Sequence, residues 1–550
     1  MINCGSGVQL KRNVCCKMRD GIELTSDHYY PAEPGPHPTL LVRQPYGKDI
    51  ATTVVYAHPV WFARHGYNVV IQDVRGRGES AGEFYPFRHE AQDGFDTIAW
   101  LATLPECDGQ VGMYGFSYQG MTQWLAAAEK PPALKVIAPA MTATDLFHGW
   151  FYMNGALRQI NTIGWGMQML REDARRSGLR ETSVKLERAW TDLRPEIIQA
   201  PMLGERLFES DELPTYLGDW MRQNQPGKYW EKLDVSSKIA AIDIPALHVS
   251  GWYDSYLNGS VLGFDSLRIH PHQYLLAGPW MHIPWGRKIG EMDCGEAAAL
   301  DTDTILLQWF NHWLKNSGEF KEASPIRHFV LGKNEWQNAS GWASNTEGLT
   351  LYLQSNGAAN SSTGDGILST EPPIGEQPYD IFIHDPEIPV SAPNLGDQTV
   401  LEQGNNVLIY TTPPLQNDVQ ILGSPRLRLY AISSAAHTDF VGKLVSVSPT
   451  GRATFICIGI ARSQFIFGET YSADTIHFWD FELEPTSCFF PAGHSIRLEI
   501  ASSAFPLFDR NPGQNIHSAL ADSWNWKRST QMILHNPAQH SCLILPIVAA

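Results

Sequence analysis

The segment YGFSYQG (114–120) places Ser117 between an apolar run and a run rich in alanine and leucine. Gly115, two residues before the serine, permits a sharp turn from a strand into a helix, and such a turn exposes the hydroxyl. The N–H groups and the positive dipole end of that helix could stabilise an oxyanion. The motif departs from G-x-S-x-G, because Gln119 stands where the second glycine belongs. Ser117 is a candidate nucleophile, and the alternative is a serine that caps an ordinary helix.

Two later residues could serve as acid and base with this serine. The run PALHVS (245–250) leads into GWYD, which ends at Asp254, and the run QYLLAG (273–278) leads into PWMH, which ends at His282. In α/β-hydrolases the acid and the histidine follow the serine in this order, each after a late strand. The alternatives are a turn aspartate and, among 19 histidines, a surface histidine. Order and placement favour a Ser117–His282–Asp254 triad.

Such a triad needs a parallel sheet whose strands end at one edge. Short apolar runs bounded by Pro and Gly are typical of buried parallel strands, and they occur at 39–45, 67–73, 110–114, 245–250 and 273–278. Segments with helical spacing or composition alternate with them, at 90–104, 117–129 and 301–316. This alternation predicts an α/β fold with a parallel sheet.

The rest of the chain differs in pattern. Residues 145–240 carry helical patterns and many charges, which indicates a helical cap inserted into the sheet domain. From 346 to 550, short alternating segments are separated by turns rich in Gly, Pro, Asn and Asp, which is typical of an antiparallel β-sandwich. We therefore expect an α/β-hydrolase core formed by 1–144 and 241–345, a cap over 145–240 and a β-sandwich over 346–550.

Composition limits the partners. Hydrophobic residues make up 43% of the chain and charged residues 18%, which is enough to bury large cores. The net charge of −17 argues against nucleic-acid binding, because phosphates would be repelled. No apolar run approaches the roughly 18 residues that a membrane helix needs. We expect a small-molecule substrate, no nucleic acid and no membrane.

The eight cysteines are scattered, and no pair has the spacing of a metal site. Sparse cysteine in a long chain suits a reducing compartment, and the first residues contain no apolar run of signal-peptide length. We therefore expect a cytoplasmic protein without a metal or an organic cofactor. A homodimer is plausible.

Several motifs together resemble the superfamily of cocaine esterase and X-prolyl dipeptidyl peptidase. This superfamily also holds α-amino-acid ester hydrolases and glutaryl-cephalosporin acylases, and cocaine esterase is the member that the chain resembles most. The resemblance spans nearly the whole chain, through RQPYGK (43–48), QDVRGRGES (72–80), GQVGMYGFSYQG (109–120), GWYDSY (251–256), GPWMH (278–282), DPEIPV (385–390), VLIYTTPPL (407–415), TDFVGKL (438–444) and FPLFDRNPG (505–513).

The resemblance implies roles for individual residues. It makes Ser117 the nucleophile, Asp254 the acid and His282 the base, and its glycine-shifted elbow accounts for Gln119. It implies an oxyanion hole formed by the Tyr46 hydroxyl and the Tyr118 backbone N–H. It also implies a jelly roll as the C-terminal sandwich.

The same resemblance implies a substrate pocket between core, cap and jelly roll. Trp150, Trp165 and Tyr256 match aromatic positions that line it, and the alternative is that they are ordinary core aromatics. Asp73, Arg75 and Arg77 are expected to form a structural loop network.

The expected activity is cleavage of carboxylic esters or amides through an acyl-enzyme. One alternative is an X-prolyl dipeptidyl peptidase or another aminopeptidase, which would need carboxylates to hold a free α-amine. Another is a biosynthetic acyltransferase with the same triad. A third is a non-catalytic carbohydrate-binding protein that uses its jelly roll, although an intact triad speaks against it.

Overall fold

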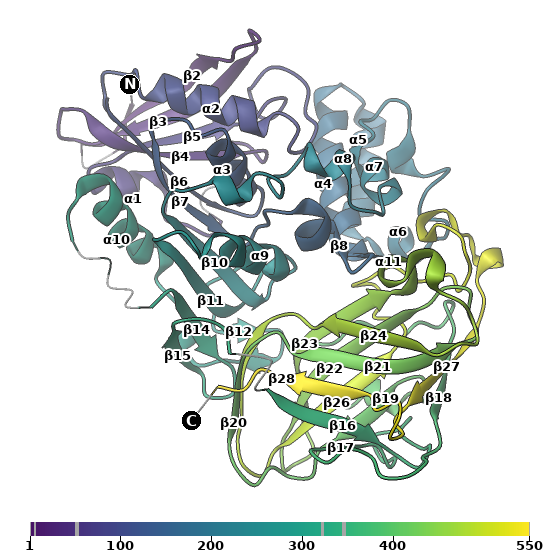
Figure 1. The fold of residues 1–550 in the computed structure, drawn as a ribbon. Coiled ribbons are helices and arrows are strands. Elements are labelled where there is room, and N and C mark those ends of the chain that lie inside the picture. Colours follow the sequence, from purple (N-terminus) through teal and green to yellow (C-terminus); the bar gives the residue numbers. More distant parts are fainter. Residues whose placement is uncertain are drawn as a thin grey trace.

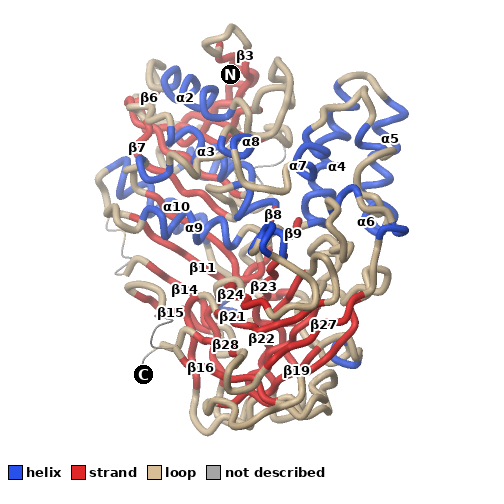
Figure 2. The backbone as a smooth tube through the Cα atoms, turned by 45° about the vertical axis from the view of Figure 1, so that its right-hand side comes forward, coloured by secondary structure: helices blue, strands red, loops and turns tan. Residues whose placement is uncertain are grey.

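The computed structural model describes residues 2–4, 7–49, 54–318, 320, 324–343 and 348–548. A mixed sheet with helices on both faces forms the first part, a group of helices stands beside it, and a β-sandwich completes the chain (Figure 1). Figure 2 shows the helices of the cap next to the sheet and above the strands of the sandwich. This arrangement confirms the expected fold class of an α/β-hydrolase core with a β-rich C-terminal domain.

The core sheet has eleven strands, of which the central ones are parallel. Its spatial order is β1 (Ile2–Asn3), β2 (Gln9–Lys17), β3 (Glu23–Tyr30), β5 (Asn68–Asp73), β4 (His37–Gln44), β6 (Cys107–Phe116), β7 (Leu134–Ala140), β10 (Ala246–Tyr253), β11 (Gln273–Met281), β14 (Ile326–Val330) and β15 (Glu335–Ala339). The strand predicted at 110–114 is longer, since β6 runs from Cys107 to Phe116. Because β6, β10 and β11 are parallel members of this sheet, their carboxyl ends share one edge.

Helices cover both faces of the core sheet, which is why its strands are almost continuously apolar. In β4, Leu41 packs with residues of α2 (Glu90–Leu101) and α3 (Tyr118–Ala128), whereas its neighbour Leu40 packs with α1 (Pro59–Arg64) and α10 (Thr302–Lys315). Helix α9 (Leu257–Leu267) lies on the α3 side, where His248 of β10 contacts both Trp124 and Phe264. Alternate residues of each strand therefore serve two separate cores.

Two glycines bring β10 and β11 close together just before the predicted acid and base. Gly251 pairs with Gly278 across these strands. A Cβ on Gly251 would lie 2.2 Å from the backbone oxygen of Trp280, and one on Gly278 would lie 2.4 Å from the Trp280 ring. Only glycine fits, so the two strands approach closely where Asp254 and His282 follow.

The cap region contains a π-helix, a short hairpin and several helices. They are the π-helix Phe147–Phe151, β8 (Tyr152–Met153), β9 (Ala156–Leu157), α4 (Gln159–Arg176), α5 (Arg180–Thr191), α6 (Arg194–Ile198), α7 (Tyr216–Arg222) and α8 (Lys228–Glu231). The apolar core of the cap is continuous with that of the sheet domain on the α3 side. The cap therefore packs directly on the core.

The C-terminal sandwich is built from antiparallel strands, apart from one parallel pair, β17 with β19. The path of its large sheet is β18 (Asp380–His384), β27 (Ser529–Leu534), β21 (Arg426–Ser433), β28 (Cys542–Leu545), β16 (Leu349–Gln354), β17 (Ile367–Ser369), β19 (Leu408–Thr411), β26 (Ser495–Ala501), β22 (Asp439–Val447) and β23 (Ala453–Arg462), with β24 (His477–Glu482) on β21. Strands β20 (Val419–Gly423) and β25 (Thr486–Phe490) form a separate pair. Residues of β21 alternate between buried and half-exposed, as in a sandwich strand.

Strands β14 and β15 pair with the β11 side of the core sheet, so the core sheet extends to Ala339. We retain as a proposal the division into a core of 1–144 and 241–345, a cap of 145–240 and a sandwich of 346–550. Within the described residues, no helix combines the length and the apolar character needed to span a membrane.

Candidate active site

Ser117 occupies a strained turn between β6 and α3. Its backbone has φ of 59° and ψ of −127°, a conformation that a residue with a side chain rarely adopts. The strand ends one residue earlier and the helix begins one residue later, so the hydroxyl is held at the carboxyl edge of the sheet. Strain of this kind persists only where the surrounding structure enforces it, which supports a functional role for Ser117.

The glycines around the serine explain the shifted motif. Gly115 has φ of 140°, and a Cβ there would lie 2.5 Å from the Cβ of Gln119. A Cβ on Gly120 would lie 2.6 Å from a methyl carbon of Thr142 and 3.1 Å from the oxygen of Ala140. In this chain the close approach between α3 and the segment after β7 therefore falls at position 120, one residue later than in G-x-S-x-G.

The structure brings the three predicted triad residues together. The Nε2 of His282 lies 3.0 Å from Oγ of Ser117, and its Nδ1 lies 2.7 Å from Oδ1 of Asp254. The Asp254 side chain is fully buried, whereas 31% of the His282 side chain is exposed. This geometry suits a base that can receive a proton from the serine and a buried acid that orients it.

Two groups could donate to an oxyanion near Ser117. The backbone N–H of Tyr118 belongs to the first turn of α3, where helix N–H groups have no partner within the helix. The Tyr46 hydroxyl lies beside the Ser117 and Trp165 side chains. Burial raises the pKa of Tyr46 to about 12, so its oxygen keeps the proton that it would donate at neutral pH.

The Tyr118 side chain has a different task. Its hydroxyl donates to Oε1 of Glu90 over 2.8 Å and accepts from the backbone N–H of Phe87 over 3.0 Å. Its ring stacks on the Phe87 ring at 4.7 Å. These contacts fix the first residue of α3 and thereby the direction of its N–H.

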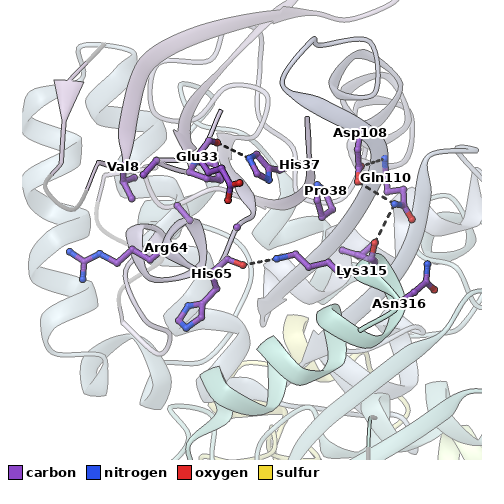
Figure 3. Close-up of a pocket in the computed structure, with 15 residues that line it drawn as sticks. Val8, Glu33, His37, Pro38, Arg64, His65, Asp108, Gln110, Lys315 and Asn316 are labelled. Atoms are coloured by element: carbon purple, nitrogen blue, oxygen red, sulfur yellow. Dashed lines mark hydrogen bonds between the residues drawn. The ribbon is translucent and has the colours of Figure 1, made fainter. Parts of the chain in front are cut away.

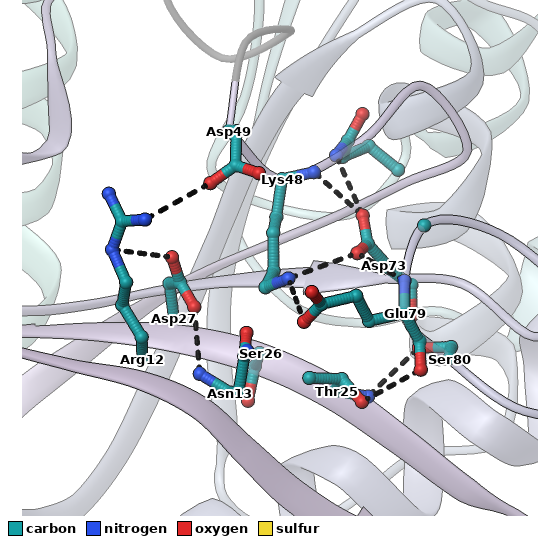
Figure 4. A network of polar contacts seen from close by, with 12 residues as sticks. Arg12, Asn13, Thr25, Ser26, Asp27, Lys48, Asp49, Asp73, Glu79 and Ser80 are labelled. Carbon is teal, nitrogen blue, oxygen red and sulfur yellow. Dashed lines mark hydrogen bonds and ion pairs between the residues drawn. The ribbon is translucent and has the colours of Figure 1, made fainter.

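A polar network holds the loop that carries Tyr46 (Figure 4). The carboxylate of Asp73, at the end of β5, accepts from the backbone N–H of Lys48 over 2.7 Å and from that of Glu79 over 3.2 Å. The Lys48 ammonium lies 3.5 Å from Asp73 and 3.0 Å from Glu79. Gln44 links this network to the site, because it donates to Asp73 and accepts from the Tyr46 backbone N–H.

The neighbouring arginines are also structural, as predicted. Arg75 pairs with Asp93 at 2.6 Å, and Arg77, which is fully buried, pairs with Asp173 of α4 at 2.6 Å. Neither guanidinium is directed at the triad in these contacts. The ion pair between Arg77 and Asp173 thus links the loop after β5 to helix α4 of the cap.

A cavity of about 510 Å³ opens in front of the serine. Its lining comprises triad residues, aromatic and aliphatic side chains and two amides: Tyr46, Val54, Phe116, Ser117, Ile160, Asn161, Gly164, Trp165, Gln168, Trp190, Tyr256, His282 and Ile283. Among the described residues that line it, none carries a carboxylate. The acidic residues of the cap do not compensate, since Asp211, Glu212 and Asp219 lie outside the lining and Asp219 accepts from Tyr85 and Thr215 instead.

The predicted aromatic residues divide into two groups. Trp165 and Tyr256 line the cavity, whereas Trp150 does not. Trp150 is buried and stacks on the Tyr256 ring at 4.0 Å, so it supports the wall from behind. The rings form a continuous series, because Tyr256 contacts His282 edge-on at 4.9 Å and Trp165 stacks on Trp220 at 5.1 Å.

Sequence reasoning missed much of the cavity wall. Ile160, Asn161, Gly164 and Gln168 flank Trp165 on one face of α4, and Trp190 comes from α5. Their spacing of three and four residues marks one helix face. The same spacing is expected of a face buried in a core, so the sequence gives no signal that this face borders a cavity.

A larger cavity of about 890 Å³ lies at the opposite edge of the sheet (Figure 3). It is lined by residues near the amino ends of β4 and β6, including His37 and Asp108, and by the C-terminal ends of α1 and α10. Lys315 reaches across it to the backbone oxygen of His65. Because Ser117 follows the carboxyl end of β6, this cavity has no access to the triad.

Comparisons with known proteins identify the family of the chain. Residues 20–284 match the family model described as X-Pro dipeptidyl-peptidase (S15 family), and residues 318–544 match that of the X-Pro dipeptidyl-peptidase C-terminal non-catalytic domain. The cocaine esterase of Rhodococcus sp. (strain MB1 Bresler) is 33% identical over 567 residues, covering 98% of this chain and 98% of that protein. The chain belongs to the S15 family of serine hydrolases.

Solved structures show the same fold as this S15 hydrolase. An aminopeptidase from a marine sediment archaeon (Thaumarchaeota archaeon) superimposes with a TM-score of 0.81 at 21% identity, covering 99% of this chain and 97% of that one. An α-amino acid ester hydrolase superimposes with a TM-score of 0.80 at 23% identity, covering 100% and 98%. At these identities the likeness concerns the fold alone.

The Asp73 network of the S15 hydrolase gives a first testable prediction. In Asp73→Asn, an NH2 group replaces one carboxylate oxygen. This donor would face the N–H and ammonium donors that the carboxylate now accepts from. We expect the free energy of unfolding to fall by about 1–3 kcal/mol, as is usual when buried donors lose their acceptor. The displaced Tyr46 loop should also lower kcat. Urea denaturation and steady-state kinetics measure the two effects.

A matched control comes from the same region. Arg12 lies 4.0 Å from Asp27, and 56% of its side chain is exposed. Arg12→Ala should change stability by no more than about 0.5 kcal/mol, because exposed ion pairs contribute little. If Asp73→Asn is as mild as this control, the network does not hold the loop.

Proposed function

We propose that this S15 hydrolase cleaves carboxylic esters or amides through an acyl-enzyme formed on Ser117. The observation that carries the proposal is the continuous hydrogen-bonded series from Asp254 through His282 to Ser117, which faces a cavity large enough for a small-molecule substrate. Such a series converts a weak nucleophile into a reactive one.

The reaction would proceed in two halves. His282 Nε2 takes the proton of Ser117 while Oγ attacks the substrate carbonyl, and the resulting imidazolium is stabilised by Asp254. The imidazolium then gives the proton to the departing alcohol or amine as its bond to the carbonyl carbon breaks. Water, deprotonated by the same imidazole, then attacks the acyl carbon. The bond from this carbon to Oγ of Ser117 breaks, the acid leaves, and the imidazolium returns its proton to Oγ.

The oxyanion would lie between the Tyr46 hydroxyl and the Tyr118 backbone N–H. Both groups are fixed before substrate arrives, Tyr46 by the Gln44 contact and Tyr118 by its place at the start of α3. Donors that are already oriented stabilise developing charge without reorganisation, which is often the largest single contribution to catalysis.

The lining of the cavity supports an uncharged acyl group. A free α-amine that enters an apolar pocket loses hydration at a cost of several kcal/mol unless a carboxylate replaces the water. The described lining offers Asn161 and Gln168 amides and aromatic rings but no carboxylate. Cation–π contacts with the rings would contribute only about 0.5–2 kcal/mol. These features favour an esterase or amidase over an aminopeptidase.

The role of Ser117 is tested by Ser117→Ala. We expect kcat on a simple ester to fall by roughly 10⁴-fold or more, since triad residues act as a unit. Labelling by a fluorophosphonate probe should be abolished, while circular dichroism stays that of the folded protein. Near-normal turnover by this variant would refute the assignment, because ester cleavage would then not depend on Ser117.

The role of Tyr46 is tested by Tyr46→Phe. Loss of one oxyanion donor typically lowers kcat by about 10²–10³-fold. Because the donor acts mainly in the transition state, KM should change little, and fluorophosphonate labelling should slow but persist. An unchanged kcat would remove Tyr46 from the oxyanion hole.

Substrate preference separates the esterase from the aminopeptidase. We expect kcat/KM to be higher for N-acetyl-phenylalanine methyl ester and phenyl acetate than for phenylalanine methyl ester and alanyl-proline p-nitroanilide. A preference of about 100-fold or more for the free amines, roughly 2.7 kcal/mol at the transition state, would favour the peptidase instead. The four substrates should be compared at one pH, with the amines protonated.

A further inference from the structure

Helix α4 lines one side of the cavity in front of Ser117. Asn161, in its first turn, donates from Nδ2 over 2.9 Å to Oγ of Ser255, the residue that follows the triad acid. Trp165 lies one turn further along, beside the Tyr46 hydroxyl. Gln168 follows Asn161 by seven residues on the same face, which at 1.5 Å per residue carries it about 10 Å along the wall. Gln168 is thus one turn beyond the part of α4 that faces the oxyanion hole.

The two amides of the described lining differ in what they bind. Asn161 is committed to Ser255, whereas the Gln168 side chain has no hydrogen-bond or ion-pair partner among the described residues. Gln168 is half-buried, so it is neither packed in a core nor fully surrounded by water. A side-chain amide carries two donor hydrogens and an acceptor oxygen. Gln168 therefore offers both kinds of hydrogen bond to a molecule in the cavity.

The wall around Gln168 carries no net charge. Within the described lining, the ionisable side chains are Tyr46, Tyr256 and His282, which lie around the triad. Arg171, one turn after Gln168, lies 4.9 Å from the centroid of the Trp190 ring and pairs with Glu187 at 2.5 Å. The charge of Arg171 is therefore balanced outside the lining, and an uncharged ligand group suits this part of the cavity.

Exposure distinguishes the mouth of the cavity from its floor. Val54 and Ile283 are 57% and 59% exposed, whereas Ser117 and Tyr256 are each 5% exposed. The exposed pair therefore belongs to the mouth and the buried pair to the floor. A substrate that extends from the serine towards the mouth would cover aliphatic side chains, and the Gln168 amide would be within reach of a polar group on it.

We propose that Gln168 determines specificity by binding a neutral polar substituent, such as an amide, that the substrate carries several bonds away from its scissile carbonyl. The substituent takes the place of water at the Gln168 amide, while the connecting part of the substrate lies against the Trp165 and Trp190 rings. The inference rests on the proposed esterase or amidase function and names its substrate class. Gln168 touches no reacting atom in this scheme, so it acts through substrate binding.

The experiment uses pairs of esters that differ by one acetamido group. Phenyl acetate is paired with 4-acetamidophenyl acetate, which carries the amide on the leaving group. Phenyl butanoate is paired with phenyl 4-acetamidobutanoate, which carries it on the acyl group. The ratio of kcat/KM values within a pair, compared between variants, measures recognition of the amide, because both esters use the same triad. The pair that responds shows on which side of the carbonyl the amide binds.

Gln168→Leu removes the amide and keeps a side chain of similar size. We expect the acetamido ratio of the responding pair to fall by about three- to tenfold relative to wild type, as for the loss of one uncharged hydrogen bond, with the change mainly in KM. The matched control is Gln223→Leu, which removes an exposed amide at the end of α7, outside the described lining. This control should leave both ratios unchanged.

Gln168→Glu tests the position of the side chain by charge. The substitution is nearly isosteric and puts a carboxylate where the amide was. The probes carry a trimethylammonio group in place of acetamido: 4-(trimethylammoniomethyl)phenyl acetate and phenyl 4-(trimethylammonio)butanoate. We expect the kcat/KM ratio of the cationic ester to its uncharged partner to rise by about fivefold or more, because opposite charges a few ångströms apart attract.

A lower acetamido ratio in Gln168→Leu together with a higher cationic ratio in Gln168→Glu supports the proposal. Ratios within about twofold of wild type in either variant, or an equal change in Gln223→Leu, overturn it. If Gln168→Leu does not fold, the near-isosteric Gln168→Glu decides alone. Phenyl acetate hydrolysis and fluorophosphonate labelling of the wild-type protein test Ser117 separately, so failure of this inference is distinguishable from failure of the proposed function.

Discussion

The hydrogen bond between Asp254 and His282 is the constraint on which the site depends. The Asp254 side chain is fully buried, so no water competes with the imidazole for Oδ1. The core sheet alone does not cover this carboxylate, and residues of the cap pack on the loop that carries it. Trp150 and Asn161 of the cap contact Tyr256 and Ser255 in the loop after β10. The residue before α4, Arg158, is in turn bound to Glu484 of the sandwich, so the cap links the two domains close to this loop.

Glycines allow the backbone segments that carry the three triad residues to approach one another closely. Gly251 and Gly278 let β10 and β11 come together just before the acid and the base, and Gly115 and Gly120 let α3 turn back on β6 at the nucleophile. Each glycine stands where a methyl group would collide with a neighbour at 2.6 Å or less. The triad residues thus follow short, rigid connections and not long loops, which keeps their mutual distances small.

The sequence was a good guide to the parts of this arrangement that depend on local pattern. Apolar runs marked the parallel strands, and the parallel arrangement implies that Ser117, Asp254 and His282 share an edge. Local pattern said less about packing between distant segments. It did not separate Trp150, behind the wall, from Trp165 in it, nor did it show that one face of α4 borders a cavity. Arg158 and Glu484 are 326 residues apart and have no shared local signature, so only the folded chain brings them together.

The series of stacked rings around the cavity has an optical consequence. Tyr256 touches the His282 imidazole, stacks on Trp150 and lines the same cavity as Trp165, which lies parallel to Trp220. Indole emission responds to nearby charge and polarity, and parallel indoles a few ångströms apart couple their electronic transitions. A change in the charge on His282, or a molecule in the cavity, is therefore expected to alter the absorption and emission of several of these rings. The wall of the cavity is in this sense also an intrinsic reporter, because occupation of the cavity should change its fluorescence and near-ultraviolet dichroism without a label.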